Sequence, residues 1–196
     1  LTARPDPGLI EDCLVLVEHL GAARTVVDVG SGGGLPGLPL KIARPDLELN
    51  LIEADQDKAA FLVHACAQLG LKGVEVVARR AEDAGHDPRL RGAFDVAVAR
   101  ALAPLPVLVE LCLSLVRVGG TLLAQKTRDE DPDAARHAIA VMGGSLSTVQ
   151  ASRSVACRGA TVVVIAKISD TPAHYTRSRG LPSRKPLFGR IKGRFP

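Results

Sequence analysis

The chain of 196 residues is poor in aromatic side chains, with no tryptophan, one tyrosine and four phenylalanines. It also lacks long apolar runs, since no stretch approaches the ~20 residues that a membrane-spanning helix needs, and no signal peptide is visible. The remaining composition, 46% hydrophobic and 23% charged, is ordinary for a soluble globular protein. We therefore expect one soluble domain that is large enough to bury a substantial core, and we expect a monomer with no membrane partner.

Closely spaced metal ligands are absent as well. The five histidines show no metal-ligand spacing, and the cysteines form no C-x-x-C pair. We expect no metal site. The sequence favours an interpretation of the cysteines as small buried hydrophobes in the reducing environment of the cytoplasm; they are Cys13, Cys66, Cys112 and Cys157.

Acidic side chains are missing from residues 171–196, which hold seven basic residues. Because the whole chain carries +4, residues 1–170 carry 18 basic against 21 acidic side chains, about −3. A near-neutral body with a basic tail indicates a polyanionic partner, although a solvated extension is the alternative. Few aromatic side chains are available there to stack on bases, so we expect the tail to bind the phosphates of RNA. The candidate RNA-binding residues are Tyr175, Arg177, Arg179, Arg184 and Lys185.

Predicted strands and helices alternate along most of the chain, which is typical of a parallel sheet covered by helices on both faces. Two further β-rich runs near the end, joined by a short turn at Arg158-Gly159, predict an antiparallel hairpin at the sheet edge. We expect strands at 25–30, 47–53, 74–78, 94–99, 121–125, 145–154 and 160–168. We expect helices at 11–20, 36–44, 57–69 (capped by Asp57) and 104–115, and from Asp131 or Asp133 to Met142. The domain thus spans 1–168, with 1–22 preceding the sheet, and a loop-like, partly mobile basic tail spans 169–196.

The most informative stretch runs from Asp28 to Gly37, where a β-branched strand ends at an aspartate and a glycine-rich loop follows. Glycines let a ligand lie against the backbone, as in the first turn of a doubly wound nucleotide-binding sheet. The G-x-G-x-x-G spacing also fits a dinucleotide. However, the D-x-G-x-G-x-G spacing, with a carboxylate facing the ligand's ammonium group, favours S-adenosylmethionine, because a pyrophosphate avoids a neighbouring carboxylate. The loop residues that this spacing predicts to bind the cofactor are Asp28, Gly30, Gly32 and Gly34.

Other candidate residues end the following strands. Glu53 can accept hydrogen bonds from both ribose hydroxyls, and Ala81 and Glu82 lie where an adenine edge would reach them. Arg100 and Lys126 end two later strands at the same rim and are the candidate catalytic residues. Each has an alternative role: a turn cap for Asp28, a surface carboxylate for Glu82, and ordinary loop ion pairs for the two cations.

From Asp28 onward the chain resembles the small-subunit ribosomal RNA methyltransferase G family, also called glucose-inhibited division protein B. The resemblance lies in residues 28–46 with their Leu-Pro-Gly-Leu-Pro, in R-R-A-E, F-D-V-A-V-A-R-A and G-G-T-L-L-A-Q-K, and in the Tyr/Arg/Pro/Lys-rich tail. It differs at Leu9, Cys13, Leu102 and Thr127. Family members usually carry several tens more residues at the amino end, so a shortened chain is expected.

The resemblance implies a Rossmann-like class I S-adenosylmethionine-dependent methyltransferase with a mostly parallel seven-stranded sheet. Its cofactor contacts match Gly30, Leu35, Ala81, Glu82 and Arg100. It implies methylation of N7 of a guanine in 16S ribosomal RNA, with the small ribosomal subunit as partner. A degenerate methyltransferase fold that only binds ribosomes, and a nucleotide-binding oxidoreductase, remain the alternatives.

Overall fold

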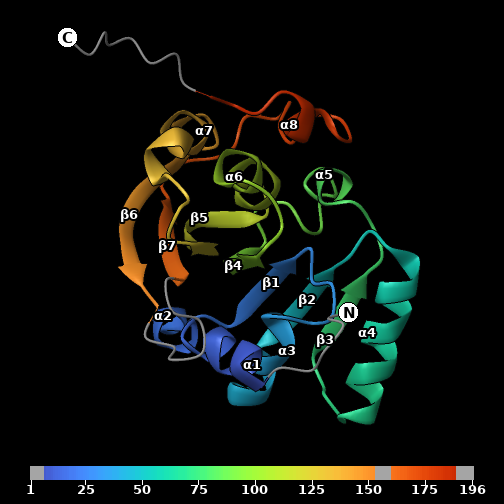
Figure 1. Ribbon diagram of the computed structural model, residues 1–196. Helices are drawn as coiled ribbons and strands as arrows, with labels where there is room; N and C mark the ends of the chain where they lie inside the picture. Colours follow the sequence, from blue (N-terminus) through green and yellow to red (C-terminus); the bar gives the residue numbers. More distant parts are fainter. Residues whose placement is uncertain (1–6, 153–159, 189–196) are drawn as a thin grey trace, which may run out of the picture.

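A computed structural model describes residues 7–152 and 160–188. Seven strands within these ranges form one sheet in the order β3-β2-β1-β4-β5-β7-β6 (Figure 1). Strands β1 to β5 are parallel, whereas β7 runs antiparallel to both β5 and β6. The strands are β1 (Thr25–Val29), β2 (Glu48–Ile52), β3 (Val74–Val77), β4 (Phe94–Arg100), β5 (Val116–Thr127), β6 (Gly144–Ala151) and β7 (Ala160–Lys167). The predicted sheet and its antiparallel edge are confirmed, and the predicted turn at Arg158-Gly159 lies outside the described residues.

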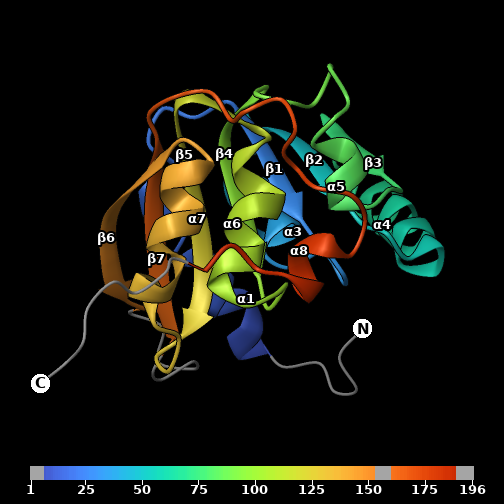
Figure 2. The ribbon, with the colours of Figure 1, turned by 90° about the horizontal axis from the view of Figure 1, so that it is seen from above.

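Helices cover both faces of the sheet (Figures 1 and 2). On one face lie α1 (Pro7–Leu14), α2 (Val17–Leu20), α3 (Gly37–Ala43) and α4 (Gln56–Gln68). On the other lie α5 (Ala81–Ala84), α6 (Leu105–Leu113), the 3-10 helix η1 (Pro132–Ala135), α7 (Arg136–Val141) and α8 (Leu181–Arg184). Each face has its own cluster of buried apolar side chains, so the molecule has three layers.

The burial of the central helix α6 shows how the sequence produces these layers. Every residue of its sequence LPVLVELCL is buried, as expected for a helix that is apolar except for Glu110 and has neighbours all around it. Strand β1 is likewise buried along four of its five residues, because a parallel strand in the middle of a sheet is covered on both faces. Helix α6 and strand β1 are therefore the most deeply buried of these elements.

Two helix predictions were wrong at their boundaries. The helix expected at 11–20 is broken, since α1 ends at Leu14 and α2 begins at Val17. Asp55, not Asp57, caps α4, because its backbone is extended and its Oδ1 accepts hydrogen bonds from the backbone N–H groups of Asp57 and Lys58 at 3.0 and 3.1 Å.

Strand β5 is also longer than predicted and begins at Val116. Gly119 and Gly120, which directly precede the predicted strand at 121–125, lie within β5, where Gly119 takes a φ of +83°. A register shift between β4 and β5 at this point indicates that the glycines form an irregularity in the pairing and not a reversal of the chain.

Two predictions from composition can be compared with the described ranges. Cys13, Cys66 and Cys112 are buried free thiols, as expected, whereas Cys157 lies outside the described residues. No helix in residues 7–152 or 160–188 combines the length and apolarity needed to cross a membrane.

The described part of the tail, residues 169–188, follows β7 and crosses the helical face that carries α5 and α6 (Figure 2). Apart from α8 it is irregular, which agrees with its loop-like composition. It differs from a free extension because Thr171, Thr176 and Pro182 are buried. Several contacts described below attach it to the domain.

Candidate active site

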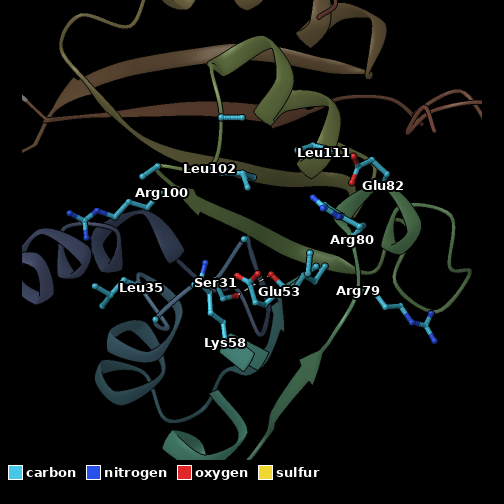
Figure 3. Close-up of a pocket in the computed structure, with 18 of the residues that line it drawn as sticks. Ser31, Leu35, Glu53, Lys58, Arg79, Arg80, Glu82, Arg100, Leu102 and Leu111 are labelled. Atoms are coloured by element: carbon cyan, nitrogen blue, oxygen red, sulfur yellow. Dashed lines mark hydrogen bonds between the residues drawn. The ribbon is translucent and has the colours of Figure 1, made fainter. Parts of the chain in front are cut away.

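A cavity of about 710 Å³ opens at the carboxyl ends of the parallel strands (Figure 3). From the neighbouring strands β1 and β4 the chain leaves toward opposite faces, to α3 and to α6. The resulting crevice is where ligands bind in doubly wound sheets. The lining residues are Leu9, Gly30, Ser31, Gly32, Gly33, Leu35, Ile52, Glu53, Ala54, Lys58, Arg79, Arg80, Ala81, Glu82, Arg100, Ala101, Leu102, Ala103, Leu111 and Ser183.

The loop after β1 presents backbone to this cavity. Gly30 and Gly32 have φ angles of +74° and +52°, which disfavour any side chain. A Cβ on Gly30 would lie 2.5 Å from Cδ1 of Leu102, so glycine also allows the loop after β4 to approach closely. The hydroxyl of Ser31 donates to the carbonyl of Asp28 at 2.9 Å and fixes the loop. The predicted contacts Gly30, Gly32 and Leu35 all line the cavity.

Glu53, at the end of β2, has a carboxylate that organises two loops. Its Oε2 accepts a hydrogen bond from the backbone N–H of Gly32 at 2.8 Å, and its Oε1 accepts one from Asp55 at 2.9 Å. The side chain is buried to all but 8% and lines the cavity. Since each carboxylate oxygen has a second lone pair, Glu53 can hold the glycine loop and still accept hydrogen bonds from ligand hydroxyls.

Asp28 and Gly34 do not line the cavity, contrary to the expectation that they face the ligand. Asp28 is completely buried, and its Oδ2 accepts a hydrogen bond from the backbone N–H of Gly37 at 2.9 Å, where α3 begins. Within residues 7–152 and 160–188 its Oδ1 has no hydrogen-bond partner, and burial raises the pKa of Asp28 to about 7. A Cβ on Gly34 would overlap the side chain of Leu38. Both residues thus fix the turn between β1 and α3 from the side that faces away from the cavity.

Glu82 lies in α5, and Ala81 beside it also lines the cavity. The Glu82 side chain is 8% exposed, and its Oε1 accepts a hydrogen bond from the backbone N–H of Gly180 at 2.8 Å. Among the residues that the structure describes, none donates to Oε2. The carboxylate therefore connects the C-terminal segment to the cavity.

Arg100 lines the cavity at the end of β4, and its side chain extends toward α1 (Figure 3). Its Nη2 lies 3.5 Å from Oδ2 of Asp12, and its Nη1 lies 3.9 Å from the sulfur of Cys13, so α1 orients the guanidinium. Burial raises the pKa of the Cys13 thiol to about 12, which keeps this neighbour neutral. The next residue, Ala101, has a φ of +50°, an uncommon backbone conformation for a residue with a Cβ.

Lys126 does not reach the cavity, contrary to the expectation that it lies on the rim. Its Nζ donates to the carbonyl of Ala103 at 2.7 Å and pairs with Glu130 at 2.7 Å. Glu130 in turn accepts a hydrogen bond from the backbone N–H of Leu105 at 2.6 Å. Because its charge is used to hold the loop between β4 and α6, Lys126 supports the cavity wall from behind.

Sequence reasoning did not identify several lining residues. Lys58 lines the cavity and points from the first turn of α4 toward the glycine loop (Figure 3). Arg80 precedes the predicted pair Ala81 and Glu82 and extends into the same space. Ser183 belongs to α8, about a hundred residues along the chain from Glu82, and no local pattern signals such a contact.

The predicted RNA-binding residues fall into two groups. Arg177 pairs with Glu110 at 2.6 Å, and Arg179 pairs with Asp83 at 2.5 Å, so both have partners within the protein. Arg184 and Lys185 are exposed at the end of α8. Tyr175 packs against the core cluster of the α6 face. The other three basic residues of the tail, Arg190, Lys192 and Arg194, lie outside the described residues.

Solved structures of other proteins show the same fold. A geranyl diphosphate methyltransferase in complex with S-adenosylmethionine gives a TM-score of 0.62 at 15% identity, covering 81% of this chain and 85% of that chain. A T. thermophilus 16S rRNA methyltransferase in complex with AdoMet and guanosine gives 0.57 at 17% identity, covering 85% of this chain and 40% of the other. The fold is therefore that of class I S-adenosylmethionine-dependent methyltransferases.

Sequence comparison narrows this class to one family. The family model described as rRNA small subunit methyltransferase G matches residues 8–158. The ribosomal RNA small subunit methyltransferase G of Roseiflexus castenholzii is 46% identical over 165 residues, which covers 83% of this chain and 70% of the relative. The chain belongs to the rRNA small subunit methyltransferase G family, which confirms the resemblance seen in the sequence.

Proposed function

We propose that this chain transfers the methyl group of S-adenosylmethionine to N7 of a guanine in 16S ribosomal RNA. The observation that supports this best is the cavity at the β1–β4 crevice. Its lining brings the glycine loop, Glu53, Glu82 and Arg100 together in a chain that belongs to a methyltransferase family.

The cavity has the groups needed to hold this cofactor, which supplies an electrophilic methyl group when bound. The glycine loop leaves room for a ligand against the backbone, and a side chain at Gly32 would be strained by its φ of +52°. Glu53 offers carboxylate lone pairs to ribose hydroxyls. Glu82 and Ala81 would bind the adenine edge, while Arg100 would orient the ligand carboxylate or the guanine.

Guanine N7 carries an in-plane lone pair and no proton, so the attack on the methyl group requires no general base. The two carboxylates that line the cavity, Glu53 and Glu82, already accept hydrogen bonds from backbone N–H groups. The protein's contribution is then alignment of the reacting atoms and exclusion of water, which can account for a large part of a catalytic rate enhancement. The planar fork of Arg100 suits this better than a lysine would.

The RNA would approach from the side of α8. Arg184 and Lys185 are exposed there, and Ser183 of the same helix lines the cavity. Phosphates bound at these cations would place RNA next to the reacting atoms. Arg177, Arg179 and Tyr175 would contribute mainly by holding this segment in place. The partner is the small ribosomal subunit or its 16S rRNA, met by a monomeric protein in the cytoplasm.

The test is an incubation with labelled S-adenosylmethionine and small ribosomal subunits that lack the modification, followed by mapping of the labelled base. Label on N7 of one guanine is the expected result. Binding to subunits without any transfer would indicate a degenerate methyltransferase fold that serves as a ribosome-binding module, and label on another base or atom would exclude the proposed substrate.

A further inference from the structure

The C-terminal segment 171–185, here called the strap, crosses α5 and α6, and Arg91 holds its first residues. The guanidinium of Arg91 donates four hydrogen bonds to backbone carbonyls. Three of the acceptors belong to the strap, namely Tyr175 at 2.6 Å, Thr171 at 2.7 Å and Pro172 at 3.1 Å, and the fourth is Gly85 at 2.7 Å, just after α5. One side chain thus ties the start of the strap to the end of the helix that carries Glu82.

The middle of the strap is anchored in α6. Thr176 is completely buried, and its hydroxyl lies 3.0 Å from that of Ser114. Arg177 pairs with the fully buried carboxylate of Glu110 through its guanidinium and also donates its backbone N–H at 3.0 Å. Since such a carboxylate is costly to leave unpaired, this part of the strap has a defined position.

Beyond the anchor the strap reaches the cavity. Arg179 donates to both carboxylate oxygens of Asp83, at 2.9 and 2.8 Å, and the backbone N–H of Gly180 donates to Oε1 of the neighbouring Glu82 at 2.8 Å. Ser183, three residues later, lines the cavity itself. Two adjacent acidic residues of α5 are therefore held by two adjacent residues of the strap.

We propose that the strap belongs to the cofactor site, with Gly180 as a positioning residue for Glu82. The hydrogen bond from Gly180 holds Oε1 and fixes the carboxylate of a residue that lines the cavity, which leaves Oε2 to accept a hydrogen bond from the ligand. A carboxylate whose rotamer is fixed before the ligand arrives binds more tightly, because no rotamer freedom is lost on binding. This inference rests on the proposed function, since it takes Glu82 as a cofactor contact.

Gly180 can be tested by substitutions that change only its backbone preference. Its φ is +71°, and a Cβ placed there would meet no atom within 4 Å, so packing is left unchanged. Gly180→Val introduces a β-branched side chain that disfavours this conformation, whereas Gly180→Asn is the matched control because asparagine tolerates it. Glu82→Gln replaces an acceptor oxygen by a donor group. The double variant with Gly180→Val and Glu82→Gln completes a double-mutant cycle.

The experiment measures the Kd of S-adenosylhomocysteine for the full chain and for each variant by calorimetry, with thermal melting to verify folding. We expect Gly180→Val to weaken binding about fivefold and Glu82→Gln about tenfold. Gly180→Asn should bind like the parent. Since Gly180 acts through Glu82, the double variant should be no weaker than Glu82→Gln alone.

The positioning role would be overturned if the fold-losses in affinity of the two single variants multiplied in the double variant. It would also be overturned if a folded Gly180→Val protein bound S-adenosylhomocysteine as tightly as the parent. A parent protein that fails to bind S-adenosylhomocysteine would instead overturn the proposed function. The two failures are thus distinguishable.

Discussion

The guanidinium of Arg177 donates hydrogen bonds of 2.8 and 2.6 Å to the two carboxylate oxygens of Glu110, a side chain with no exposed surface in the middle of α6. A residue from the basic tail therefore neutralises a charge in the hydrophobic layer. This contact makes the tail part of the folded domain.

Replacing Arg177 by methionine should lower the free energy of unfolding by about 3–5 kcal/mol, because it leaves the buried Glu110 carboxylate without its partner. Denaturant unfolding measures this loss. Adding Glu110→Gln to the same variant removes the uncompensated charge and should restore part of the stability. A loss below about 1 kcal/mol, typical of an exposed ion pair, would show that the contact does not anchor the tail.

The titration of Asp28 should make the stability of the folded protein depend on pH. Burial raises its pKa from an ordinary 3.8 to about 7 in the folded protein. Between these values the folded state keeps a proton that the unfolded state has lost, so the free energy of unfolding falls as pH rises through this window.

Asp28→Asn lacks this titration but retains an acceptor for Gly37. The variant should therefore gain stability relative to the parent as pH rises from about 4 to 8, by at most about 4 kcal/mol for a shift of this size. Urea unfolding at several pH values measures the difference. A difference that stays constant with pH would show that Asp28 is ionised throughout.

Arg100→Lys keeps the positive charge near Asp12 but loses the planar fork that fits a carboxylate or a base edge. Methyl transfer should fall about 10- to 100-fold through misalignment, since small displacements of reacting atoms are costly. Single-turnover transfer from labelled S-adenosylmethionine measures this step. Arg117→Lys, at a half-exposed ion pair with Asp95, is the matched control and should leave the rate unchanged. Equal rates in both variants would remove Arg100 from the mechanism.

RNA binding should depend on salt through the exposed cations of α8. Changing both Arg184 and Lys185 to glutamine should reduce the slope of log K against log salt by about 1.4, at roughly 0.7 per phosphate contact on single strands. Filter binding at several salt concentrations measures the slope. Lys72→Gln is the control, because Lys72 is exposed just before β3, at the amino edge of the sheet. An unchanged slope in the double variant would place the RNA contacts elsewhere.

Local patterns in the sequence predicted most of the fold. The β-branched runs, the glycine loop and the prolines that begin α3 and α6 depend on residues close together in the chain, so the strands and the β1–α3 turn could be recognised. Glu53 and Arg100 followed from their positions at strand ends, because the ends of parallel strands meet at one edge.

The remaining features depend on contacts between distant residues. The sequence could not show that Lys126 contacts Ala103 and Glu130, or that Asp28 turns toward Gly37 and away from the cavity. The tail was expected to be partly mobile because its charge pattern is visible locally, while its partners Asp83 and Glu110 lie 96 and 67 residues away. A basic run therefore indicates a polyanionic partner only for cations that the fold leaves unpaired.

The most direct test of the account is calorimetric titration of the folded chain with S-adenosylhomocysteine and, separately, with NADH. The account predicts saturable binding of one S-adenosylhomocysteine per chain and no heat with NADH, because the cavity is expected to hold an adenosyl amino acid beside Glu53 and the glycine loop. Binding of NADH without binding of S-adenosylhomocysteine would contradict it.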